Sequence, residues 1–311
     1  MRSHLDELAD TLDANTTVEV FDYSIVKEDL DDLLPAVNNT IASAEPELST
    51  YEKALPMIMD LQIVVNTVAW SAIHTLCLAR TDSAEAPDYI FTTPPLTRTL
   101  LDSLLNTIFM FDNPEENVHW FLVSGWREQV KTFNRYKTKY GKNAAWATWL
   151  EFARRDIDQT EKFFVALSPE EKQGKATTRF WPNPGKMGAI HKDPARSFPM
   201  RDAGRTQFVR YMKDWHYGRL SGESHLNLQG LLNRGALHLP RAGNADAESF
   251  AARTRFMYLT SAFSIYLALI TEVALEVSFP KDRLLPIWRK TAAAWSDVGE
   301  LYTERYQALL R

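Results

Sequence analysis

Apolar residues recur every three or four positions along most of this chain, which is typical of helices that bury one face. Residues 47–80 show the spacing at the following apolar positions: Ile58, Leu61, Val65, Val68, Ala72 and Leu76. Few runs alternate with a period of two, and glycine is scarce, at 12 of 311 residues. The pattern therefore predicts an all-α fold, a multi-helix bundle of long antiparallel helices with the helix over 47–80 near its centre.

Prolines, glycines and helix-capping residues divide the rest of the chain. Paired prolines after Thr93 indicate a helix start, and Asn113 followed by Pro114 indicates the end of that helix and the start of the next. We expect helices over these ranges: 114–140, 144–166, 205–234, 246–279 and 281 to the end. Residues 168–204 contain five prolines and four glycines, so they predict one long irregular loop, either a binding element or a flexible insertion.

Charge is distributed unevenly along the chain. Residues 1–60 carry 14 acidic and 3 basic side chains, although the net charge of the whole chain is only −5. We therefore expect an acidic N-terminal helical segment over 1–46 and a single helical bundle domain over 47–311. The N-terminus lacks the basic and apolar regions of a secretory signal, which favours a cytoplasmic protein. The apolar stretch 256–279 contains glutamate and hydroxyl side chains, so a buried helix is expected there and no membrane span.

The middle of the chain is basic and rich in aromatic residues. Residues 124–219 hold 20 Lys or Arg and 10 Asp or Glu, and Arg127 and Lys131 begin a basic stripe with a four-residue period. Cations neutralise phosphates and rings stack on bases, so this composition suits RNA or another phosphate-bearing ligand. A solvated helix surface above an aromatic core gives the same composition, and the sequence leaves both interpretations open.

A polar stretch near residue 220 is the strongest candidate for chemistry. On a helix, Tyr217, Ser221 and His225 lie four apart on one stripe, while Arg219 and Glu223 form a second. Histidine titrates near neutral pH and arginine holds phosphate, so the group can form a reaction centre. The same contacts can instead brace a helical bundle.

A second polar stripe lies earlier in the chain. Arg98 and Asp102 are four residues apart on the helix that follows the paired prolines. An inward-facing Arg98 would meet His225 and contribute to binding, whereas an Arg98–Asp102 ion pair would only brace the bundle. The seven histidines show no metal-binding spacing and Cys77 is the single cysteine, so no metal site and no cofactor are expected.

The order of these motifs resembles a family of all-helical, mostly bacterial proteins, a domain of unknown function with a Tyr-x3-Ser-x3-His signature. Tyr217, Ser221 and His225 match that signature, and the Arg98-x3-Asp102 stretch is similar to the family's upstream Arg-x3-Glu helix.

The region also resembles the HEPN superfamily, whose ribonuclease members use an Arg-x4-6-His motif at a dimer interface. Arg219 and His225 fit that spacing. The resemblance implies a homodimer that cleaves or binds RNA without a metal, with His225 in proton transfer, Arg219 on the phosphate, and Ser221 with Tyr217 orienting the imidazole. The alternative is a non-catalytic helical module that binds a protein or ligand.

Overall fold

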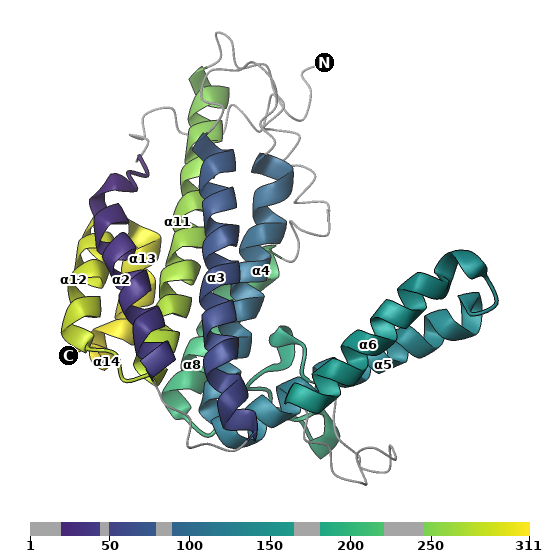
Figure 1. Ribbon diagram of the computed structural model, residues 1–311. Coiled ribbons are helices and arrows are strands. Elements are labelled where there is room, and N and C mark those ends of the chain that lie inside the picture. Colours follow the sequence, from purple (N-terminus) through teal and green to yellow (C-terminus); the bar gives the residue numbers. More distant parts are fainter. Residues whose placement is uncertain (1–19, 44–49, 79–88, 165–180, 221–244) are drawn as a thin grey trace. The chain divides into compact units, whose positions relative to one another are not determined.

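The computed structural model describes residues 20–43, 50–78, 89–164, 181–220 and 245–311 (Figure 1). Within these ranges the secondary structure is helical and contains no strand. The predicted all-α fold is therefore confirmed.

The chain forms two compact units. Unit 1 comprises Met1–Thr40, Leu61–Thr107 and Gln207–Arg311, and unit 2 comprises Ile41–Asp60 and Ile108–Thr206. The predicted division at residue 46 depends largely on residues outside the described ranges and stays a prediction.

Unit 1 is built around α11 (Ala245–Glu276), which runs beside parts of α3 (Thr50–Leu78) and α4 (Tyr89–Asp112) (Figure 1). The Trp70 ring of α3 packs edge-on against Phe263 of α11 and stacks on Tyr266, whose hydroxyl is 2.9 Å from that of Thr67. The remaining helices of this unit are α2 (Ser24–Ser43), most of α8 (Ala203–Met212), α12 (Lys281–Ala294), α13 (Ser296–Leu301) and α14 (Gln307–Leu309).

Two helices are long and apolar enough to cross a membrane, and they differ in burial. The most apolar window of Ala251–Glu276 is 94% buried, whereas that of Ala54–Leu78 is 28% buried. Length and composition are shared by core helices of soluble proteins and by membrane spans, so this finding alone is weak evidence for a membrane. The burial of α11 shows that it forms the core of unit 1.

The exposed face of α3 differs from the sequence-based prediction. Leu61, Val65 and Val68 were expected to face inward, yet 49%, 54% and 65% of their surfaces are exposed. Ile58 of the predicted stripe is buried, and the other buried positions of α3 include Ile63, Asn66, Trp70, Ile73 and Cys77. Both stripes have three-to-four spacing because the helix is apolar on nearly all sides, so periodicity alone does not identify the inner face.

A buried ion pair joins α11 to the C-terminal helices of unit 1. Arg305 lies on the π-helical turn η5 (Tyr302–Tyr306) and donates from Nε and Nη2 to the two carboxylate oxygens of Glu272, at 2.5 and 2.9 Å. The Tyr306 hydroxyl donates to the same carboxylate at 3.0 Å. Because three donors meet one buried carboxylate, the charge of Glu272 is compensated inside the core.

Unit 2 contains an antiparallel hairpin of α5 (Pro114–Tyr140) and α6 (Ala147–Phe164) (Figure 1). The predicted start of α5 at Pro114 and its end before Gly141 are confirmed. The short 3-10 turn η1 (Ala144–Trp146) leads into α6, and the Asn143 side chain accepts a hydrogen bond from the backbone of Ala145. The hairpin therefore ends in a tight, capped connection.

The described part of the predicted loop, residues 181–202, is irregular apart from two 3-10 turns, η2 (Pro184–Lys186) and η3 (Pro194–Arg196). It is held against the helices of unit 2. The Trp181 backbone N–H donates to Ser124 at 2.6 Å, and the Asp112 carboxylate accepts from the backbone N–H groups of Arg201 and Asp202. The described part is a packed segment of unit 2, and the prediction of a long irregular loop is confirmed there.

Candidate functional sites

A polar cluster in unit 1 joins the two motif regions of the sequence. The Arg98 guanidinium carbon lies 3.5 Å from the centroid of the Tyr217 ring, and the Arg98 Nε donates to Asp102 Oδ1 at 2.9 Å. Arg98 and Asp102 lie on α4, one turn apart, and Tyr217 ends the π-helical turn η4 (Lys213–Tyr217). We call these three residues the arginine–tyrosine cluster.

Burial sets the electrostatics of this cluster. The side chains of Arg98 and Asp102 are 15% and 35% exposed. Burial raises the pKa of the Asp102 carboxyl, and the adjacent Arg98 partly opposes this rise. A cation is stabilised both by a ring face and by a carboxylate that it contacts, so the cluster holds η4 against α4.

A second cluster lies between the same turn and α11. Arg219 Nη2 donates to the Ser261 hydroxyl at 2.9 Å, and that hydroxyl lies 3.4 Å from His216 Nδ1. Burial, and then the charge of Arg219, lower the pKa of His216 to about 4. His216 is therefore neutral at pH 7 and accepts a proton only in acid.

Arg219 retains an unused donor in this second cluster. Its Nε–H is buried and has no hydrogen-bond partner among the residues that the structure describes. A buried, charged N–H without an acceptor costs free energy, and an anionic or carbonyl ligand would satisfy it.

The two clusters occupy different sides of the segment that follows η4. Residues two apart on a helix point about 200° from each other, so Tyr217 faces α4 while Arg219 faces α11. No described contact joins Arg98 to Arg219. The structure thus places the predicted residues Arg98, Asp102 and Tyr217 together and places Arg219 in the second cluster.

Three predicted site residues, Ser221, Glu223 and His225, lie outside the described residues. Their roles, and the expected approach of Arg98 to His225, stay predictions. The sequence interpretation missed His216, although its position three residues before Arg219 is the spacing of one helix face. Helical spacing between a histidine and an arginine was the signal that could have found it.

The basic stripe lies on α5 of the hairpin in unit 2. Lys131 is exposed and forms an ion pair with Glu128 at 3.3 Å, and Arg127 lies one turn earlier and is half-buried. Exposed pairs of this kind contribute little stability.

Aromatic rings gather where α5 meets η1 and α6. The Tyr140 and Trp146 rings are stacked, with centroids 4.3 Å apart and an interplanar angle of 6°. Tyr136 stacks on Trp146, and Trp149 contacts Trp146 edge-on. We call this group, which holds the hairpin end together, the aromatic end cluster.

Cations surround the aromatic end cluster. Residues 131–155 include seven Lys or Arg and one Asp or Glu. Lys139 Nζ lies 5.0 Å from the Tyr140 ring, and the Arg155 guanidinium lies 5.7 Å from the ring of Phe152, which is 52% exposed. The hairpin end therefore presents both cations and ring surface to solvent.

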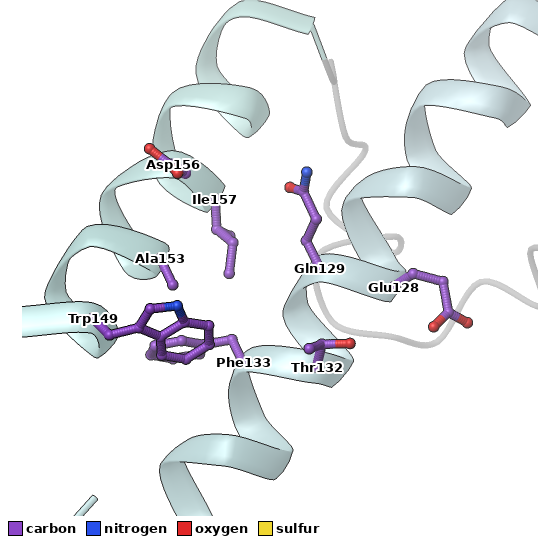
Figure 2. Close-up of a pocket in the computed structure, with 8 residues that line it drawn as sticks. All are labelled: Glu128, Gln129, Thr132, Phe133, Trp149, Ala153, Asp156 and Ile157. Carbon is purple, nitrogen blue, oxygen red and sulfur yellow. The ribbon is translucent and has the colours of Figure 1, made fainter. Parts of the chain in front are cut away.

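A cavity of about 370 Å³ lies between α5 and α6 (Figure 2). Its apolar lining comprises Phe133, Trp149, Ala153 and Ile157. Thr132 and Gln129 add polar groups from α5, and the remaining lining residues are the acidic Glu128 and Asp156. Figure 2 shows the Gln129 side chain between the two helices. The cavity is large enough for a small aromatic group.

Within the described part of the chain, no group of three or more His, Cys, Asp or Glu side chains could hold a metal ion. Comparison of the chain with family models, with curated proteins and with solved structures gives no match.

Proposed function

We propose that this protein binds single-stranded RNA through the end of the α5–α6 hairpin. The observation that carries the proposal is the combination of seven basic residues and one acidic residue over 131–155 with the exposed rings of Trp149 and Phe152. Phosphates are attracted to the cations, and unpaired bases stack on the rings.

An unpaired strand fits this surface better than a duplex. Bases inside a duplex are already stacked and offer no free face, whereas a single strand can place a base on an aromatic side chain. The cavity between α5 and α6 supports this choice because Phe133 and Trp149 supply apolar surface and Gln129 supplies an amide for a base edge.

The binding test uses a fluorescein-labelled 12-nucleotide single-stranded RNA and its duplex, measured by fluorescence anisotropy. The triple variant Lys137→Gln, Lys139→Gln, Lys142→Gln should weaken binding at least tenfold and reduce the magnitude of the salt dependence by roughly two, because three phosphate contacts are lost. The variant Trp149→Ala, Phe152→Ala should weaken single-strand binding selectively.

A matched control separates this site from general basic charge. The triple variant Lys281→Gln, Arg283→Gln, Arg289→Gln removes the same charge from α12 in unit 1. If it weakens RNA binding as much as the hairpin variant, or if the duplex binds as tightly as the single strand, the proposed interface is wrong.

RNA cleavage is the second candidate function, and the Arg219 Nε–H, which is buried and has no partner among the described residues, favours it. In this proposal Arg219 holds a phosphate, Ser221 and Tyr217 orient His225, and His225 takes the proton of the 2′-hydroxyl as that oxygen attacks the adjacent phosphorus. The P–O5′ bond breaks in the same step, and the leaving 5′-oxygen takes a proton from water. The products are a 2′,3′-cyclic phosphate and a 5′-hydroxyl.

The cleavage test uses a mixed RNA pool in EDTA with wild type, Arg219→Ala and His225→Ala. Cleavage by wild type that is lost in both folded variants would support a metal-independent ribonuclease. Binding without cleavage by wild type would leave RNA binding as the function, and absence of both would favour the alternative of a non-catalytic module with a protein or small-molecule partner.

A further inference from the structure

A cavity of about 530 Å³ in unit 1 shares no lining residue with the two polar clusters and contains a different chemistry. One wall comes from α8 and η4, and the other from α13 and η5. The lining includes Tyr211, Trp215, Gly299, Glu300, Thr303 and Glu304. Both π-helical turns of the described chain thus contribute to this one cavity.

The first wall is aromatic. Tyr211 and Trp215 lie four residues apart, with ring centroids separated by 6.4 Å and an interplanar angle of 41°. The Tyr211 hydroxyl donates to Glu300 Oε2 at 3.4 Å, which links this wall to the opposite one. Trp215 is 65% exposed, so its ring surface contributes little to the core and is accessible to a ligand.

The second wall is acidic. Glu300 and Glu304 are exposed and lie four residues apart on one helix face, where like charges repel. Among the residues that the structure describes, no basic side chain lines the cavity. Arg305, which follows Glu304 in the sequence, is committed to Glu272 in the core. The two carboxylates therefore face the aromatic wall, and no described cation lies between them.

Backbone geometry fixes both walls. A π-helical turn adds one residue to a helical turn, and such turns occur frequently at functional sites. In η4 the turn exposes Trp215 while His216 is buried, and in η5 it exposes Glu304 while Arg305 is buried. Gly299 allows the second wall to pack closely against α12, because a Cβ at this position would lie 3.1 Å from the carbonyl oxygen of Ala292.

We propose that this cavity binds an organic cation, such as a quaternary ammonium group. The face of Trp215 attracts a cation through its quadrupole, and the carboxylates of Glu300 and Glu304 supply the opposite charge. Burial of Tyr211 beside these carboxylates raises its pKa, so its neutral hydroxyl remains a donor to Glu300. A divalent metal fits less well because it needs about six oxygen ligands.

Choline is the probe, and its neutral isostere 3,3-dimethylbutan-1-ol is the matched control ligand. The full chain is titrated with each, and two NMR signals are followed: the indole N–H of Trp215, assigned by its loss in Trp215→Phe, and the backbone amide of Thr303. Choline should shift both signals saturably, with at least tenfold higher affinity than the isostere. Equal shifts by the two ligands, or no saturable shift with choline, would overturn the proposal.

Variants then test which groups bind. Glu300→Gln with Glu304→Gln should weaken choline binding at least tenfold, and Trp215→Leu should do the same when the Thr303 amide is followed. The control pair Glu28→Gln with Asp32→Asn removes two exposed acids at the same spacing from α2 of unit 1 and should leave binding unchanged. If the control pair weakens binding as much as the cavity pair, choline is attracted only by the overall negative charge of the protein, and the proposed site is wrong. Trp215, Glu300 and Glu304 are exposed, so all these variants should keep the thermal unfolding midpoint of the wild type within a few degrees.

Discussion

The guanidinium carbon of Arg98 lies 3.5 Å from the centroid of the Tyr217 ring, and the Nε of the same side chain donates to Asp102. This contact links two sequence motifs that are far apart in the chain and lie on different helices of unit 1. The cation is shared between a ring face and a carboxylate, so neither interaction can be removed without affecting the other.

Removal of Arg98 should destabilise unit 1 more than removal of Tyr217. Arg98→Ala deletes the cation–π contact and leaves the half-buried Asp102 carboxylate without its partner, so the free energy of unfolding should fall by about 1–3 kcal/mol. Urea denaturation of Arg98→Ala, Tyr217→Leu and the double variant gives their coupling energy, expected at about 0.5–2 kcal/mol. Additive effects of the two substitutions would show that the contact contributes nothing to stability.

His216 should make stability depend on pH in mild acid. Its pKa is about 4 in the folded chain and about 6.5 when unfolded, so the unfolded state binds more protons between these values. The stabilising contribution is complete above pH 6.5 and is lost as pH falls toward 4. At pH 4.5 the loss should reach about 2 kcal/mol.

The variant His216→Asn isolates this effect from the titration of carboxylates. Its free energy of unfolding should fall less than that of wild type between pH 7.5 and 4.5, and the difference measures the contribution of the histidine. Identical pH profiles for the two proteins would mean that folding does not change the pKa of His216.

The buried ion pair between Glu272 and Arg305 leads to a different expectation. Arg305→Met leaves an uncompensated carboxylate in the core and should cost about 3–5 kcal/mol. The double variant Glu272→Met, Arg305→Met removes both charges and should recover most of that loss. Guanidinium chloride denaturation measures the free energy of unfolding of the single and double variants. If the double variant is no more stable than Arg305→Met, the loss of stability comes from lost packing and not from the unpaired carboxylate.

Sequence periodicity predicted the helices of this chain better than their faces. Pro114 begins α5 because proline favours the first helical turn, and at Gly141, just after its end, a Cβ would clash with the carbonyl oxygen of Lys137. The π-helical turns η4 and η5 carry no such marker, so the burial of His216 beside the exposed Trp215 depends on tertiary contacts that no local pattern encodes.

The sequence likewise predicted only part of the candidate site. The four-residue spacing of Arg98 and Asp102 predicted that they could pair, and it gave no information on which helix would lie opposite. The meeting of Arg98 with Tyr217, and of Arg219 with Ser261, depends on how α4 and α11 pack around η4 within unit 1.

The two apolar stripes of α3 can be separated by experiment because they differ in burial. Val65 and Val68 are 54% and 65% exposed, whereas Ile73 is fully buried. Val65→Gln with Val68→Gln should change the free energy of unfolding by less than about 0.5 kcal/mol, since glutamine favours helix and stays hydrated. Ile73→Ala should cost about 2–4 kcal/mol because it leaves a cavity in the core of unit 1.

Chemical denaturation of the two variants compares the faces directly. A large cost for the valine pair would mean that this stripe is covered in solution, since exposed side chains cannot lose packing.

The same pair should also lower any tendency of the chain to associate, because it interrupts an exposed apolar patch that contains no charged side chain between Leu61 and Leu78. Sedimentation of wild type and the valine variant over a range of concentrations measures that change, and association that is equal in both proteins would exclude this face as its cause.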